Sequence, residues 1–101
     1  MSDDAIVVRI DRKLSALAPK FLADCRRMPG ELRGAIASGN IAAARGIGHS
    51  LWGTGSSYGF DGIGSLGEEI ERAARAGDIE AVRKLAQQLD SYLARVRPVF
   101  D

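Results

Sequence analysis

The 101-residue sequence has few of the residue types on which several common functional classes depend. It contains one cysteine, Cys25, which excludes an internal disulfide and a cysteine-rich metal site. It also contains one histidine, His49, and a single histidine does not form a zinc site without carboxylate or cysteine ligands. Fourteen basic and thirteen acidic residues leave a net charge of +1. This balance gives no reason to expect nucleic acid or an anionic membrane as a partner.

Long apolar runs are scarce as well. No stretch approaches the roughly 18 apolar residues that cross a bilayer, and the acidic first four residues do not resemble the start of a signal peptide. We therefore expect a cytoplasmic protein without membrane contact. The length fits one compact domain, and we predict a single domain over residues 1–101 with its bundle core at about 18–97.

What the sequence does contain is a series of amphipathic segments separated by glycine and proline signals. Apolar residues between Pro19 and about residue 38 recur at steps of three and four, which predicts a helix that Pro29 and Gly30 should kink or locally break. Three further helices are predicted, one capped by Asn40, one over about residues 63–76 and one capped by Asp78 that extends to about residue 96. We predict an all-α protein, an antiparallel up-and-down four-helix bundle with a short N-terminal helix or arm.

Two segments are less clear. Residues 5–14 include Ile6, Val7 and Val8, which favour a strand, but no partner strand is evident later in the sequence. We therefore expect a short helix or an ordered arm that packs across the end of the bundle. Residues 53–64 are dense in glycine, so a turn or a distorted helix end is expected there.

His49 lies on the predicted helix that follows Asn40. At about 100° per residue, the apolar positions of this helix fall on one side: Ile41, Ala44, Gly48 and Leu51. The histidine points about 130° away from their centre, so we expect it to face solvent. Its neighbours on the exposed side are Arg45, Trp52, Gly53 and Ser56.

An exposed histidine of this kind has a specific chemical use. A neutral imidazole nitrogen is a good nucleophile towards phosphorus, because its pKa lies near 6.5. Phosphoryl transfer needs in-line positioning and positive charge, and little covalent machinery. Gly53, one turn after His49, leaves room for a partner to approach. Most lone surface histidines have no function, so this interpretation needs further support.

That support is a resemblance. Residues 48–60, GHSLWGTGSSYGF, resemble the signature of the histidine phosphotransfer (HPt) family, approximately H-x-L-K-G-x-x-x-x-x-G. The matching positions are His49, Leu51, Gly53 and Gly59. The spacing from Phe21-Leu22 to the histidine and the later strings LGEEIE and AGD are also similar to the family, so the resemblance covers about residues 10–96.

The resemblance implies a histidine-containing phosphotransfer protein of a two-component phosphorelay. Such a protein accepts a phosphoryl group on its histidine, here His49, from a receiver aspartate or a kinase such as a hybrid sensor histidine kinase. It then passes the group to the receiver domain of a response regulator. The protein is expected to be a phosphocarrier without ATP-dependent activity or a cofactor of its own, since the Mg²⁺ of the transfer belongs to the receiver. We expect a monomer.

One position departs from the signature. The family usually has lysine three residues after the histidine, where this sequence has Trp52. Arg45, one turn before His49, is the residue that we expect to supply the missing charge. The alternative is a non-catalytic module that binds receiver or kinase domains without efficient transfer. Trp52 itself either covers the edge of the core or anchors a partner.

Other patterns have simpler interpretations. Gly62, Gly64 and Gly67 match the dinucleotide-binding string, but no strand precedes them, so we do not expect nucleotide binding. The glycine-rich residues 53–59 offer backbone N–H groups to an anion, which leaves an anion-binding bundle as a third possibility. The acidic cluster of Glu68, Glu69 and Glu71 is interpreted as solvated helix surface, and Asp61 as a helix cap.

Overall fold

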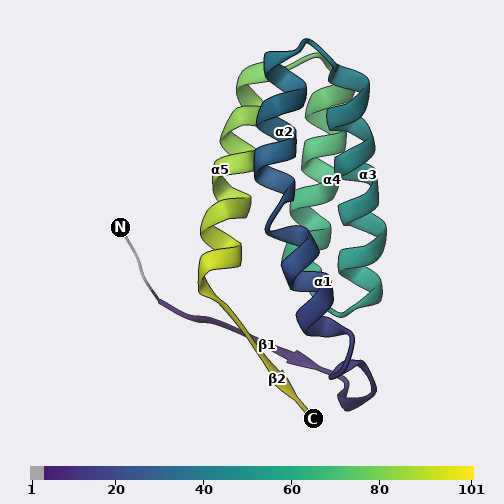
Figure 1. Ribbon diagram of the computed structural model, residues 1–101, viewed down its shortest axis with the longest axis vertical. Coiled ribbons are helices and arrows are strands. Elements are labelled where there is room, and N and C mark those ends of the chain that lie inside the picture. The colour runs from purple at the N-terminus through teal and green to yellow at the C-terminus, as the bar shows by residue number, and fades with distance from the viewer. Residues whose placement is uncertain (1–3) are drawn as a thin grey trace.

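The computed structural model describes residues 4–101. Its order of elements is β1 (Ile6–Ile10), a 3-10 helix η1 (Arg12–Leu14), α1 (Ala18–Cys25), α2 (Met28–Ala37), α3 (Ile41–Ser57), α4 (Asp61–Arg75), α5 (Ile79–Arg95) and β2 (Val96–Phe100). In Figure 1, α1 and α2 stand end to end as one column, and α3, α4 and α5 alternate in direction beside it. The predicted antiparallel up-and-down bundle is confirmed, with a broken first helix.

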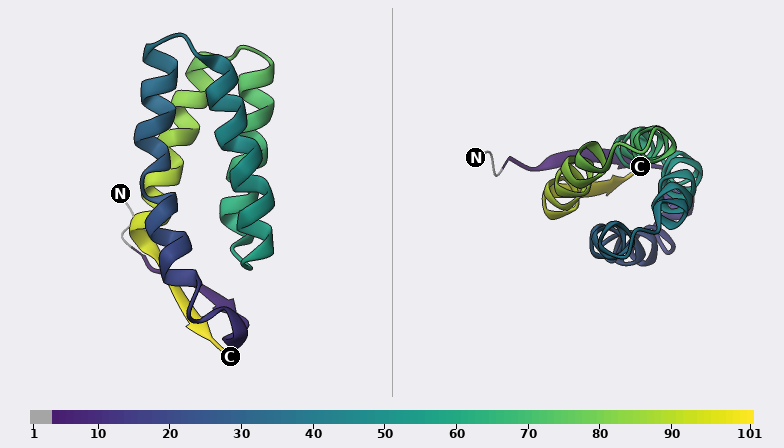
Figure 2. Two further views of the ribbon diagram at one scale, coloured as in Figure 1. Left: turned by 45° about the vertical axis from the view of Figure 1, so that its right-hand side comes forward. Right: turned by 90° about the horizontal axis from the view of Figure 1, so that it is seen from above.

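Figure 2 shows the four columns from above, and the buried apolar side chains that form the core come from all of them. Large apolar side chains from three of the columns are fully buried, among them Leu32, Ile70 and Leu89. Cys25 is also buried, and desolvation raises the pKa of its thiol to about 12. The cysteine is therefore a small core residue, as the amphipathic pattern indicates. Among the described residues, no helix combines the length and apolar character that a membrane span requires.

Proline explains the break between α1 and α2. Pro19 and Pro29 each occupy the first turn of their helix, where a missing backbone N–H removes no helical hydrogen bond. The chain therefore ends α1 at Cys25 and begins a new helix at Met28, instead of running through Pro29 with a kink. The local break predicted at Pro29 and Gly30 is confirmed, and it lies just before the proline, at residues 26 and 27.

Both ends of the chain correct the sequence prediction. Residues 6–10 form a strand that pairs in parallel with residues 96–100, with Ile6 beside Val96 and Ile10 beside Phe100. The helix expected as one alternative for residues 5–14 is wrong over this range, and the statement that no partner strand exists is also wrong. The partner was hidden at the end of the last predicted helix, because Val96 already has extended dihedral angles, φ −67° and ψ 134°.

The turn between α3 and α4 is shorter than the glycine content of residues 53–64 suggests. α3 continues to Ser57, and α4 starts at Asp61, so Asp61 lies in the first helical turn and does not cap it. Gly59 has φ +86°, which favours glycine, and a Cβ there would lie 3.1 Å from the Cδ1 of Ile10. The turn at Gly59 therefore packs closely against the side chain of Ile10 in β1.

Candidate functional site

α3 presents His49 to solvent. The helix is capped by Asn40, whose side-chain oxygen accepts a hydrogen bond from the backbone N–H of Ala43 at 3.1 Å. The side chain of His49 is 69% exposed, as the helical phase predicts. It is held halfway along a regular helix, so its backbone position is fixed by the cap and by the packing of the opposite face.

The opposite face of α3 packs unusually close to α4. A Cβ on Gly48 would lie 2.5 Å from the backbone nitrogen of Glu71, and one on Gly67 would lie 2.5 Å from the backbone nitrogen of Trp52. Neither distance is possible for a real side chain without movement of the backbone. The two glycines therefore set the distance between the helices, and they bring residue 71 to the side of the histidine.

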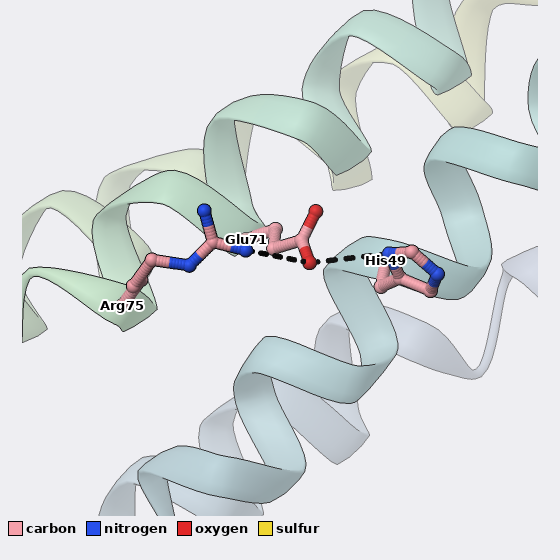
Figure 3. A network of polar contacts seen from close by, with 3 residues as sticks. All are labelled: His49, Glu71 and Arg75. Atoms are coloured by element: carbon pink, nitrogen blue, oxygen red, sulfur yellow. Dashed lines mark hydrogen bonds and ion pairs between the residues drawn. The ribbon is translucent and has the colours of Figure 1, made fainter.

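Glu71 is the residue that sequence reasoning assigned wrongly. Glu71 is only 8% exposed, so it does not belong to a solvated surface. Its Oε2 lies 3.1 Å from the Nδ1 of His49 and accepts a hydrogen bond from Nη2 of Arg75 at 3.3 Å (Figure 3). A signal was present in the sequence, because Glu71 follows Gly67 by four residues and precedes Ala74 by three, on the buried face of α4.

The contact with Glu71 determines which nitrogen of the histidine is available. An ionised carboxylate only accepts hydrogen bonds, so a neutral ring bonded through Nδ1 carries its proton there. The lone pair is then on Nε2, which Figure 3 shows on the side of the ring away from Glu71. The carboxylate therefore orients the ring and leaves its outer nitrogen as a nucleophile.

Two hollows meet at the histidine, and arginines line both. One, of about 380 Å³, is lined by Ala42, Arg45, Gly46, His49 and Glu71. The other, of about 220 Å³, is lined by His49, Trp52, Glu68, Glu71, Arg72 and Arg75. Arg45 was singled out from the sequence, whereas the two arginines of α4 were not, because their position depends on how α4 packs against α3. Arg72 and Arg75 are paired with Glu68 and Glu71, whereas Arg45 forms no ion pair within residues 4–101, so Arg45 is the cation beside the ring whose charge is not already offset.

The remaining predicted site residues lie on the same exposed surface. Trp52 is 43% exposed, and its ring stands edge-on to the His49 ring, with 6.1 Å between centroids. It does not belong to the buried core cluster, which favours the surface interpretation of this residue. A Cβ on Gly53 would meet no atom within 4 Å, and Ser56 is exposed beside Gly64. The structure brings the tryptophan next to the histidine and leaves the side of Gly53 open.

The other glycine patterns are structural. Gly62, Gly64 and Gly67 lie inside α4, and a Cβ on any of them would collide with α3 or with Tyr92 of α5. Residues 53–57 lie inside α3, so their backbone N–H groups point along the helix to carbonyl partners. An anion site built from these N–H groups is therefore not supported.

The chain was also compared with known proteins. The family model described as Hpt domain matches residues 16–98, which include all five α-helices and exclude β1. No curated protein and no solved structure matches the chain.

Proposed function

The chain belongs to the Hpt domain family, whose members are phosphocarrier modules of phosphorelays, and from this premise we propose that His49 is its phosphoacceptor. The phosphoryl group would come from a receiver aspartate or from a histidine kinase, and it would go to the receiver domain of a response regulator. The observation that carries this proposal is the exposed His49 ring, bonded through Nδ1 to Glu71 with Nε2 turned outward.

The proposed transfer balances in charge and in bonds. The lone pair of Nε2 attacks the phosphorus of an aspartyl phosphate, a new N–P bond forms, and the P–O bond to the aspartate breaks to release a carboxylate. The proton on Nδ1 stays in place, so the ring acquires positive charge beside the carboxylate of Glu71. A fixed carboxylate stabilises an imidazolium that forms in this way. The reverse sequence returns the group to a receiver.

Positive charge around the moving phosphoryl group would come from this chain's arginines. Arg45 lines one hollow beside His49, and Arg72 and Arg75 line the other in ion pairs with Glu68 and Glu71. A cation at this place offsets the charge of the equatorial oxygens. These residues would take over from the lysine that Trp52 replaces. We propose no cofactor on the chain itself. The Mg²⁺ that transfer requires would be held by the receiver.

The surface around the histidine suits a close-fitting partner. Ala42, Gly46, Gly53 and Ser56 share the exposed face of α3 with His49, and all four have small side chains. An acidic receiver pocket would therefore approach Nε2 over these small residues, with Arg45 and Trp52 as the large side chains beside the ring. We also propose a cytoplasmic location, because the ATP that charges a histidine kinase is found there. Recovery of the chain from the periplasm or the medium would contradict this location.

Labelling tests the central proposal directly. A panel of ³²P-phosphorylated receiver domains should label the protein, and the label should be acid-labile and base-stable. His49→Gln should remove all labelling, whereas Ser50→Ala, a change to the next residue on the same helix, should retain it. Equal labelling of the His49→Gln variant would overturn the proposal.

A second candidate is a binding module without efficient transfer. The observation in its favour is Trp52, an exposed aromatic side chain at the position of the missing lysine. Under this alternative, a receiver domain binds with an affinity that His49→Ala leaves unchanged and Trp52→Ala weakens. Transfer would be undetectable in the unmodified protein and would appear in Trp52→Lys. Calorimetry and the labelling experiment together separate the two candidates.

A further inference from the structure

The strand pair at the lower end of the bundle in Figure 1 is a sheet of only two strands. An isolated pair of strands is marginally stable in water. Here it is fixed to the bundle by Ile10 and Val96, both at least 98% buried. It is also closed at its end by two backbone bonds, from the N–H of Asp101 to the carbonyl of Ile10 and from the N–H of Arg12 to the carbonyl of Asp101. The sheet is therefore ordered. Each of its two strands has an outer edge that is not paired within the sheet.

Those closing bonds determine which backbone groups face which edge. The carbonyl of Ile10 points to β2, and in a strand the N–H and C=O groups of alternate residues point to opposite edges. Residues 6, 8 and 10 therefore bond to β2, and the N–H and C=O groups of Val7 and Arg9 point outward. Within residues 4–101, no backbone group is bonded to these outward groups of Val7 and Arg9.

The outer edge of β2 is different. The same alternation turns residues 97 and 99 towards β1 and Val96, Pro98 and Phe100 outward. Pro98 has no N–H to offer at the middle of that edge, and proline on an edge strand prevents pairing with another strand. The sheet is thus blocked on the β2 side and open on the β1 side.

We propose that the open edge of β1 pairs antiparallel with β1 of a second copy of this chain, around a twofold axis at Val8. In this register Val7 of one copy lies opposite Arg9 of the other, so both outward-facing residues of the strand form hydrogen-bonded pairs. The register that sets Arg9 opposite Arg9 of the second copy is disfavoured, because like charges directly opposite each other repel. The product is a twofold-symmetric dimer whose strands form one four-stranded sheet.

The exposed face of the sheet supports a second copy as the occupant. Val7 is 64% exposed and Val99 is 44% exposed, beside the arginine side chains of residues 9 and 97 on the same face. In the proposed register, each row across the four strands reads Val99, Arg9, then Val7 and Arg97 of the second copy. The aliphatic part of an arginine covers neighbouring apolar surface. Asp101 already pairs with Arg9 at 2.7 Å, which reduces the repulsion between the rows.

The proposed dimer takes the place of the monomer expected from the sequence, which does not reveal the strand pair. It does not depend on phosphotransfer, since β1 lies outside the region that matches the Hpt domain and His49 lies on α3. The carboxylate–histidine contact and the exposed face of α3 take no part in the pairing.

Sedimentation equilibrium of the full chain tests the pairing. The mass should rise from one chain to two as the concentration increases through the micromolar range. Val7→Pro removes an outward N–H without affecting a bond to β2, so it should abolish the dimer, whereas Val7→Thr, which keeps both the N–H and the branched shape, should retain it. Circular dichroism verifies that each variant is folded.

Charge substitutions at the same position test the register even if Val7→Pro unfolds the strand. Val7→Lys would lie opposite Arg9 of the second copy and should raise the dissociation constant about fivefold, since the twofold axis counts each repulsive pair twice. Val7→Glu should lower it by a similar factor. The proposal is overturned if the mass stays that of one chain at every concentration up to about 1 mM, where a dimer with a dissociation constant below this value would be detected. A dimer that Val7→Pro and both charge variants leave unchanged would overturn it equally.

Discussion

α3 carries two pairs of glycines with opposite surroundings. A Cβ on Gly48 or Gly55 would lie within 2.6 Å of the backbone of α4, while a Cβ on Gly46 or Gly53 would meet no atom within 4 Å. Each glycine in a helix costs roughly 1 kcal/mol relative to alanine. The first pair offsets this cost by the close approach of two helices. The second pair has no contact within the described chain that offsets it, and the proposed docking of a receiver gives a reason for small residues at these two positions.

The difference shows how one helix serves packing and function at once. Gly48 allows the backbone of α4 to reach the position at which Glu71 meets His49. Gly46 and Gly53 keep the other side of the histidine low, where a receiver would dock in the proposed function. Substitutions that exchange the properties of the two pairs should therefore separate stability from transfer.

The largest effect is expected from Gly53→Leu, which adds bulk on the open side. Folding stability should be equal or greater, because leucine is a better helix former, while transfer from a phosphorylated receiver should fall about a hundredfold, as expected for a displaced reacting group. Gly34→Leu is the matched control, since Gly34 is also helical with no atom near its Cβ position but lies on α2. The rate of labelling and the thermal melt are measured for both. Equal rates would remove the distinction between the open glycines.

The next effect is in stability. Gly48→Ala should lower the free energy of unfolding by about 1–3 kcal/mol, because the added methyl group forces two backbones apart. Gly46→Ala, two residues earlier, should raise it by about 0.5–1 kcal/mol, because it improves helix propensity without a clash. Urea denaturation gives both values. If both substitutions change the free energy of unfolding in the same direction, the close packing of α3 and α4 does not restrict the size of the side chain at residue 48.

A smaller effect is expected when the charge of Glu71 is removed. Glu71→Gln keeps the shape of the side chain but cannot offset the positive charge of the ring, so we expect the transfer rate to fall about tenfold, the loss of roughly one charged hydrogen bond. Glu69→Gln removes an exposed charge from the same helix and should leave the rate unchanged. Rapid-quench kinetics with a phosphorylated receiver measures both. If the Glu71→Gln variant accepts the phosphoryl group at the full rate, the orienting role of the carboxylate is contradicted.

The smallest effect is expected from Trp52→Lys. Since three arginines already line the site, another cation should raise the transfer rate by less than about threefold, which is under 1 kcal/mol. A gain of a hundredfold or more would show that charge is missing in the natural protein. That result would favour the binding module over the phosphocarrier.

The sequence predicts the parts of this account that depend on local chemistry. The caps at Asn40 and Asp78, the four columns and the exposed position of His49 follow from residue type and helical period. The strand pair does not, because Val96 continues an amphipathic pattern and only its distant partner makes it extended. The burial of Glu71 is not predicted from the sequence for a related reason. A charged residue is expected at the surface, and its burial depends on how closely a second helix approaches.

The most direct test is nuclear magnetic resonance of the ¹⁵N-histidine-labelled protein after transfer from a phosphorylated receiver. The chain has one histidine, so the spectrum contains one imidazole ring. We predict that phosphorus couples to Nε2 of His49 and that Nδ1 keeps its proton, bonded to Glu71. Phosphorus bonded to Nδ1, or a phosphorylated protein whose imidazole ring is unmodified, would contradict the account.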